Sequence, residues 1–238
     1  MAKLHIIELP KETPILEQLQ LEEALLRSDH RSICIINYGS PRAIVMGISG
    51  QPELLLNLSK VEREHLPVIK RFSGGGTVIV DRNTLFISFI IAKEDLPVVP
   101  FPEPILRWSS DLYASAWGIE GFHLRENDYC IGDRKCGGNA QYIRKGRWMH
   151  HTSFLWDYET ENMEALLLPA IRPAYRENRP HEEFLCKLKD YGSDPKTRVA
   201  QLREAIVKQL YIEDFDRSEL EDKPHRKATR VMSLHQAD

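Results

Sequence analysis

Residues 71–92 read RFSGGGTVIVDRNTLFISFIIA, and this stretch decides the fold of the chain. Two apolar runs, TVIV and TLFISFIIA, lie on either side of the polar residues Asp81, Arg82 and Asn83. Runs of β-branched and aromatic residues around a polar turn predict two strands joined as a hairpin. Three consecutive glycines, Gly74–Gly76, lead into the first of these strands.

Strand patterns recur on both sides of this stretch. Short runs rich in β-branched and other apolar residues are typical of strands in a buried sheet. The predicted strands cover Lys3–Leu9, Ser32–Asn37, Ala43–Gly47 and several segments between Gly121 and Asp157.

Apolar residues at helical spacing predict three helices. Thr13 is expected to cap the first, with Pro14 at its first position and the apolar pattern continuing to Leu26. A Pro-rich link leads into the second helix, and the chain after the last strands is mainly helical. The second and third helices are predicted at Ile105–Trp117 and Arg198–Leu210.

The predicted elements favour an α+β fold. Strands outnumber what a helical bundle allows, so we expect a mixed β-sheet with flanking helices. A length of 238 residues suits one large domain. We assign residues 1–215 to a single domain and residues 216–238 to a charged, loosely held C-terminal tail.

Composition narrows the class of protein. A formal net charge of −3, from 32 basic and 35 acidic residues, argues against a partner bound through nucleic-acid phosphates. No apolar run approaches the roughly 18 residues of a membrane span, so we expect no membrane partner. The start of the chain resembles neither a signal peptide nor a transit peptide, and four cysteines are too few for a disulfide scaffold. We expect a cytoplasmic protein, or an organelle-matrix protein if a transit peptide has been removed.

The segment Arg71–Thr77 is the first candidate site. Its glycines lose conformational entropy on folding, but they let backbone N–H groups approach a ligand such as phosphate. A flexible turn is the alternative interpretation. No Gly-Lys-Ser/Thr follows, and a strand comes next instead of a helix. The segment is therefore neither a P-loop nor a dinucleotide-binding fingerprint.

Lys135 is the second candidate. It follows a tight turn and precedes small residues in GDRKCGGNAQ, residues 132–141. An ammonium group in this setting suits a phosphate or a developing oxyanion. For an isolated lysine, a solvated side chain in a polar hairpin is the alternative.

The neighbouring histidines and cysteines do not predict a metal site. His150 and His151 are adjacent, and adjacent side chains in a strand point to opposite faces of the sheet. Cys130 and Cys136 have no second cysteine pair near them, which argues against zinc.

Together these pieces resemble the lipoate–protein ligase A family, in the biotin/lipoate ligase superfamily with its class II synthetase-like catalytic domain. The family motif Arg-x-x-Gly-Gly-Gly-x-Val is matched by residues 71–78. Asn-Asp followed by Asp-x-Lys-x-x-Gly-x-Ala is matched by Asn127, Asp128 and residues 133–140, and a His-His strand by His150 and His151. The resemblance runs from about residue 5 to residue 210.

The resemblance implies a reaction, its substrates and its acceptors. Lipoic acid, or octanoic acid, would react with ATP and Mg²⁺ to give an acyl-AMP. A lysine of a lipoyl domain would then take the acyl group. The acceptors implied are the E2 subunits of 2-oxoacid dehydrogenases and the glycine cleavage H protein.

The resemblance also implies roles for individual residues. The catalytic residues would be Lys135 and Asp128, and Mg²⁺ would come with the nucleotide, without a dedicated protein site. The implied ATP or adenylate contacts are Arg71, Gly74, Gly75, Gly76, Thr77, Val78, Ile79, Asp128 and Lys135, and the implied lipoate contacts are Arg71, Asn83, Gly138, Ala140 and His151.

Three departures from the family pattern bear on these expectations. Val80 stands where the family commonly has a histidine before Asp81, and Ser153-Phe154 replace the usual Thr-Leu pair. The chain stops before the C-terminal accessory domain that well-known bacterial ligases carry. Three alternatives follow: a separate accessory protein, activity without one, or transfer of a preformed acyl group.

The competing function is a lipoyl or octanoyl transferase of the same fold that works without ATP. Such transferases use a cysteine nucleophile, and Cys130, Cys136 and Cys186 do not match its position relative to the lysine. A biotin ligase would carry a Gly-Arg-Gly-Arg motif, which this chain lacks. A non-catalytic member of the family stays open, although it would be expected to lose the lysine.

Overall fold

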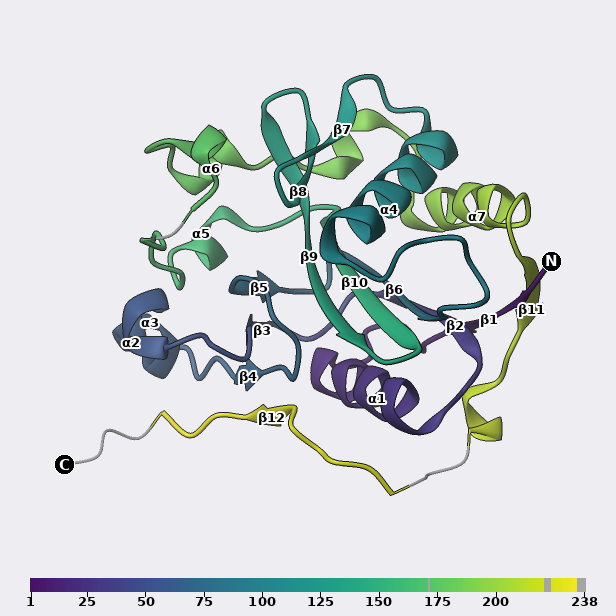
Figure 1. Ribbon diagram of the computed structural model, residues 1–238. Helices are drawn as coiled ribbons and strands as arrows, with labels where there is room; N and C mark the ends of the chain where they lie inside the picture. Colours follow the sequence, from purple (N-terminus) through teal and green to yellow (C-terminus); the bar gives the residue numbers. More distant parts are fainter. Residues whose placement is uncertain (171, 221–223, 235–238) are drawn as a thin grey trace.

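A computed structural model describes residues 1–170, 172–220 and 224–234 of the chain. Its strands form one large and one small sheet (Figure 1). The strands are β1 (Lys3–Glu8), β2 (Ser32–Tyr38), β3 (Ala43–Met46), β4 (Val68–Lys70), β5 (Val78–Val80), β6 (Thr84–Ala92), β7 (Phe122–Arg125), β8 (Asp128–Ile131), β9 (Arg134–Arg144), β10 (Arg147–Leu155), β11 (Tyr211–Asp214) and β12 (Arg230–Val231).

The large sheet has the strand order β11-β1-β2-β6-β10-β9-β8-β7, and the small sheet has the order β12-β4-β3-β5. Strands β11, β1 and β2 run parallel to one another, whereas β2, β6, β10 and β9 pair antiparallel. The predicted α+β fold with a mixed sheet is therefore confirmed.

Helices cover both faces of the large sheet. Figure 1 shows α4 (Pro102–Trp117) and α7 (Pro195–Ile206) on one side and α1 (Ile15–Ser28) on the other. Among the described residues, no helix is long and apolar enough to cross a membrane. The shorter helices are α2 (Pro52–Leu55), α3 (Leu58–Arg63), α5 (Thr160–Met163), α6 (His181–Phe184) and the 3₁₀ turns η1 (Ala174–Arg176), η2 (Leu188–Tyr191) and η3 (Arg217–Glu219).

Strand β6 is buried along its whole length because both of its faces are covered. Leu85, Ile87 and Phe89 pack into the same core as α4 and α7. On the other face, Ile90 packs with α1, and Phe86 packs with residues of the small sheet. A strand covered on both faces needs an apolar run without alternation, which is what residues 84–92 supply.

The hairpin predicted for residues 77–92 is wrong. Strand β5 pairs with β3 in the small sheet, whereas β6 pairs with β2 and β10 in the large sheet. Residues 81–83 therefore carry the chain from one sheet to the other. At this crossing the N–H of Asn83 donates to Asp81 Oδ1 at 2.8 Å. An isolated two-stranded hairpin is only marginally stable, and each strand gains more burial in its own sheet.

Helix α1 begins one residue later than predicted, and Thr13 does not cap it. The Thr13 hydroxyl donates to the carbonyl of Pro10 at 2.7 Å. The first N–H of the helix, that of Ile15, donates instead to Ser40 Oγ at 2.9 Å. A side chain 25 residues away therefore supplies the cap.

The C-terminal part of the chain contains two strands that the sequence analysis missed. Strand β11 extends the large sheet parallel to β1, and β12 extends the small sheet antiparallel to β4. The prediction of a mainly helical C-terminal part is therefore incomplete.

The C-terminal tail was predicted to be loosely held, but its residues 228–231 are docked on the domain. The N–H groups of Ala228 and Thr229 donate to the Glu23 carboxylate at 2.9–3.0 Å, and the N–H of Phe72 donates to Thr229 Oγ1 at 3.3 Å. Burial raises the pKa of Glu23, but hydrogen bonds from Thr229, Ala228 and Arg27 together outweigh burial and lower it overall. Every residue except proline has a backbone N–H, so docking through these groups leaves no pattern in the sequence. The charged composition of the tail therefore wrongly predicted that it is loosely held. Tail residues 221–223 and 235–238 lie outside the part of the chain that the structure describes.

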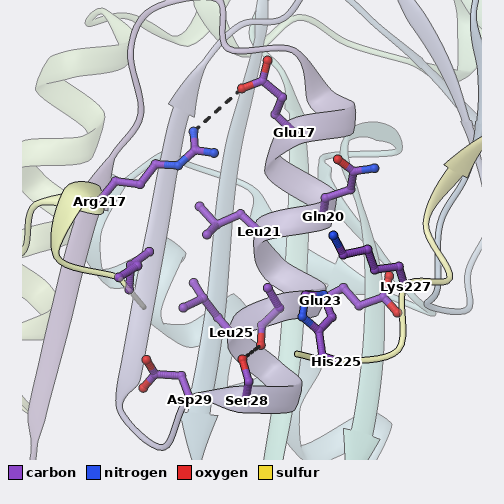
Figure 2. A pocket seen from close by; sticks show the side chains of 12 residues that line it. Glu17, Gln20, Leu21, Glu23, Leu25, Ser28, Asp29, Arg217, His225 and Lys227 are labelled. Carbon is purple, nitrogen blue, oxygen red and sulfur yellow. Dashed lines mark hydrogen bonds and ion pairs between the residues drawn. The ribbon is translucent and has the colours of Figure 1, made fainter. Parts of the chain in front are cut away.

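A hollow of about 380 Å³ lies between α1 and the tail (Figure 2). Arg217 reaches toward Glu17, with Nη1 3.8 Å from Oε2, and His225 and Lys227 lie along the same helix. The residues that line this hollow include none of the predicted site residues.

We predict that Glu23→Gln releases the tail. A neutral amide accepts weaker hydrogen bonds than a carboxylate, so the amides of residues 228 and 229 should exchange about tenfold faster at pH 7. Hydrogen exchange measured by mass spectrometry checks this. Because the pKa of Glu23 is lowered, the contact holds at neutral pH and is lost as the pH falls through that pKa. Glu103→Gln, at an exposed position of α4, is the control, and unchanged exchange in Glu23→Gln would contradict the docking.

Candidate active site

The glycine segment of residues 71–77 is folded around a buried arginine. Arg71 is 4% exposed. Its Nε and Nη2 donate to the Gly74 carbonyl at 3.2 and 2.9 Å, and Nη2 also donates to the Gly76 carbonyl at 2.9 Å. Burial lowers the pKa of Arg71 to about 10, against the attraction of Glu22, so the guanidinium is charged at neutral pH.

The backbone N–H groups of this loop are available to a ligand. Within the described part of the chain, those of Gly74, Gly75 and Gly76 donate no hydrogen bond. A Cβ on Gly74 or Gly76 would meet nothing within 4 Å, so the space beside both residues is open. The loop therefore combines free donors with open space, as anion-binding loops do.

At Gly75, unlike at Gly74 and Gly76, a side chain would collide with neighbouring atoms. Its φ is +108°, and a Cβ there would lie 2.6 Å from Arg71 Nη2 and 3.1 Å from the carbonyl oxygen of Asn139. A Cβ on Gly47 would overlap the Gly75 carbonyl oxygen. The loop is therefore held between the end of β3 and strand β9.

Lys135 and Asp128 form an ion pair where β8 and β9 pair with each other. Lys135 Nζ lies 2.7 Å from Asp128 Oδ1, and the two side chains are 21% and 9% exposed. A Cβ on Gly138 would lie 3.3 Å from the same Nζ, so the lysine lies across its own strand over this glycine. Lys135 is therefore a paired, largely buried group and not a solvated one.

Strand β9 brings most of the predicted site residues together. Asn139 and Ala140 of this strand lie beside Gly75, and Gly138 lies beneath the Lys135 side chain. Ala140 also pairs with His151 across the β9–β10 ladder. Thr77, Val78 and Ile79 continue from the loop into β5. Asn83 lies instead at the crossing between the sheets, where its carbonyl accepts from the N–H of Asp157 at 3.2 Å.

A segment that the sequence analysis missed, residues 172–186, lies along the ion pair. The Tyr175 hydroxyl donates to Asp128 Oδ2 at 2.9 Å. At the other end of the segment, the N–H of Cys186 donates to the Lys135 carbonyl at 2.9 Å. The two catalytic candidates are therefore each bound to this segment, one by a side chain and one through the backbone.

The same segment is rich in basic residues. Arg179 donates to both the carboxylate and the carbonyl of Asp133 at 3.1 Å. Burial lowers the pKa of His181 to about 4, and the charges of Arg176 and Lys135 act in the same direction. The composition of this segment was the signal: residues 172–181, RPAYRENRPH, hold three arginines, two prolines, a tyrosine and a histidine.

The two adjacent histidines face opposite sides of the sheet, as predicted. His150 Nε2 lies 2.7 Å from the Tyr129 hydroxyl, and burial lowers its pKa to about 3. His151 Nδ1 lies 2.9 Å from Glu22 Oε1 and 3.0 Å from Ser88 Oγ. Burial raises the pKa of the fully buried Glu22, but His151 and its other hydrogen-bond partners outweigh burial and lower it. Among the described residues, no cluster of His, Cys, Asp and Glu could hold a metal ion.

The four cysteines are free and buried. Burial raises the pKa of Cys34 and Cys136, and it raises that of Cys130 to about 11. A thiol acts as a nucleophile through its thiolate, so these three are poorly suited to that role. Cys186 is 3% exposed.

Comparison with known proteins identifies the family. Residues 14–211 match the family described as the lipoyl protein ligase A/B catalytic domain. The chain belongs to this family. Among relatives, it is 26% identical over 233 residues to a protein of Plasmodium falciparum named inactive lipoate–protein ligase 2, covering 74% of this chain and 61% of that one. The chain spans about three-fifths or less of the length of the curated relatives it matches.

Solved structures of lipoate–protein ligases share the fold. One, a lipoate–protein ligase A bound with ATP, has a TM-score of 0.73 at 16% identity, with 92% of this chain and 90% of that one covered. Another is described as a bi-partite lipoate protein ligase and its E2 lipoyl domain from Thermoplasma acidophilum. Its TM-score is 0.70 at 19% identity, with 90% and 86% covered. The expected fold of a lipoate–protein ligase catalytic domain is therefore confirmed.

The two glycines Gly75 and Gly76 provide a matched test of the loop. Gly75→Ala should lower the free energy of unfolding by about 1–3 kcal/mol, because the new Cβ meets Arg71 and Asn139 at a positive φ. Gly76→Ala should change it by less than about 0.5 kcal/mol, because its Cβ meets open space. Urea unfolding of both variants measures this. Equal losses in the two would contradict the described contact with β9.

Proposed function

We propose that this protein is a lipoate–protein ligase that activates lipoic acid with ATP and transfers the lipoyl group to a lysine of lipoyl domains. One observation carries the proposal: Lys135, paired with Asp128 of the adjacent strand β8, lies on β9, the strand against which the glycine loop packs, and the loop's N–H groups are free of described partners. A cation on this strand and backbone donors beside it suit an α-phosphate and a developing oxyanion. Family membership supports lipoate as the acyl group, with octanoate as the alternative.

In the first half-reaction, a carboxylate oxygen of lipoate attacks the α-phosphorus of ATP. A new acyl–O–P bond forms as the bond from the α-phosphorus to pyrophosphate breaks. Two anions must meet in this step, so the site must supply positive charge. The N–H groups of Gly74–Gly76 bind phosphate oxygens, and Lys135 lies between the phosphate and the carboxylate. Arg71 adds a fixed charge from behind the loop.

In the second half-reaction, the amine of the acceptor lysine attacks the acyl carbon, and AMP leaves with the electron pair of the C–O bond. Lys135 stabilises the oxyanion that develops on the acyl oxygen. Once Lys135 has moved to the ligand, Asp128 Oδ1 is free to take the proton that the attacking nitrogen loses. The pair therefore has one role in activation and a second in transfer.

The remaining predicted contacts divide between nucleotide and acyl chain. Thr77, Val78 and Ile79 follow the loop and are proposed to contact the adenylate. The acyl chain is proposed to follow the small residues of β9 toward the buried pair of His151 and Glu22. The proposed acyl contacts are Arg71, Asn83, Gly138, Ala140 and His151.

Mg²⁺ enters this proposal with the ATP. Both oxygens of Asp128 accept hydrogen bonds, one from Lys135 and one from Tyr175. The proposal therefore assigns the ion to the phosphates and not to this carboxylate.

The proposed partners are lipoyl-domain proteins and an accessory protein. The Thermoplasma structure is described as a bi-partite ligase with its E2 lipoyl domain, which supports an E2 acceptor and a separate accessory chain. The glycine cleavage H protein is proposed as a second acceptor. Free cysteines favour a reducing compartment, so we propose that the protein acts in the cytoplasm or an organelle matrix.

The Plasmodium relative is named inactive, so activity needs a direct test. Lys135→Ala should lower acyl transfer from lipoyl-AMP by about a hundredfold or more, because it removes the cation that stabilises the developing oxyanion. Intact-mass analysis of a lipoyl domain measures the rate. Lys145→Ala, in the exposed turn between β9 and β10, is the matched control. Transfer by Lys135→Ala at the wild-type rate would remove this lysine from the mechanism.

The two half-reactions should differ in what they require. We expect the isolated chain to modify a lipoyl domain at least about tenfold faster from lipoyl-AMP than from lipoate plus ATP, because activation must bring two anions together and exclude water. A separate accessory protein should raise only the ATP-dependent rate. Equal, fast rates from both donors would show that the chain needs no accessory protein. No modification from either donor would refute the ligase function.

A further inference from the structure

Asp128 is held on both sides, although the proposed mechanism uses only one of its oxygens. Oδ1 lies 2.7 Å from Lys135 Nζ, and Oδ2 accepts from the Tyr175 hydroxyl at 2.9 Å. The Cys130 thiol in turn donates to the Tyr175 oxygen at 3.3 Å. Hydrogen bonds to a charged group are stronger than those between neutral groups, so the phenol fixes the carboxylate firmly.

Packing fixes the ring of Tyr175 independently of its hydroxyl. Tyr175 is 8% exposed. The Arg125 guanidinium lies over the ring at 4.5 Å, and the Phe184 ring lies at a centroid distance of 5.3 Å. The Tyr175 carbonyl accepts from Arg179 Nη2 at 2.7 Å. A variant that removes only the hydroxyl should therefore leave the ring where it is.

The hydroxyl is a permanent donor. Burial raises the pKa of Tyr175, and the negative charge of Asp128 raises it further. The phenol therefore keeps its proton at neutral pH and donates it to the carboxylate.

We infer that Tyr175 is a positioning residue, which holds Asp128 in place when Lys135 leaves it for the anionic ligand. The inference rests on the proposed ligase function. With Oδ2 still bound to Tyr175, the freed Oδ1 stays aimed at the place where Lys135 was. The amine of the acceptor lysine must lose its proton there. Tyr175 therefore serves the transfer step, and the chain places it 47 residues from the carboxylate it orients.

The test compares Tyr175→Phe with Tyr158→Phe. Tyr158 is 7% exposed, and within the described part of the chain its hydroxyl makes no hydrogen bond. In single-turnover transfer from lipoyl-AMP, Tyr175→Phe should lose about tenfold or more in rate, because it removes one hydrogen bond to a charged group. The dissociation constant for lipoyl-AMP should stay unchanged, as it should in the control. A purely structural role would weaken binding and transfer together.

A double-mutant cycle tests whether Tyr175 acts through Asp128. If it does, Tyr175→Phe should slow transfer far less in an Asp128→Asn background than in the wild type. The same four proteins are unfolded in urea, where the two changes should again be non-additive. Additive losses of rate, or a normal rate in Tyr175→Phe, would overturn the inference.

The urea cycle separates this inference from the proposed function. Coupling in unfolding together with no transfer by the wild type would refute the ligase function while leaving the Tyr175–Asp128 bond established. Additive unfolding with full wild-type transfer would refute the role of Tyr175 and leave the ligase function intact.

Discussion

The backbone of Gly75, in the loop that leads into β5 of the small sheet, lies directly against the backbone of strand β9 of the large sheet. A side chain at this point would run into the Asn139 carbonyl and the Arg71 guanidinium, and one at Gly47 would run into the Gly75 carbonyl. The contact therefore exists only because both positions are glycine. Strand β9 also carries Lys135, so the approach of the two sheets brings the loop donors and the cation to one place.

The charges around this contact are buried, and each has a partner. Arg71 donates hydrogen bonds to the loop carbonyls, and Glu22 is paired with His151. Asp128 forms an ion pair with Lys135 and accepts a hydrogen bond from Tyr175. A buried charge without a partner is costly, so these partners hold the side chains in defined positions. A site whose charges are already oriented needs little reorganisation when charge develops during the reaction.

The sequence predicted what is local and missed what depends on distant partners. The strands of residues 78–92 were predicted, but their hairpin was wrong, because each strand finds its partner in a different sheet. Local residues singled out Lys135, the resemblance to the ligase family added Asp128, and the structure pairs the two. Tyr175 was missed because its role depends on a contact across 47 residues, and no period or motif reports such a contact. The tail was misjudged for the same reason, since the N–H groups of Ala228 and Thr229 dock it on Glu23.

Transfer of an oxygen atom tests most directly that this chain joins lipoate to protein through an adenylate. Lipoate labelled with ¹⁸O in its carboxylate is incubated with ATP, the protein, a lipoyl domain and, where required, the accessory protein, and the AMP is analysed by mass. If lipoyl-AMP is the intermediate, aminolysis breaks the acyl C–O bond, and one labelled oxygen leaves with AMP for each lipoyl group transferred. Lipoylated domain accompanied by unlabelled AMP, or by no AMP, would contradict the account.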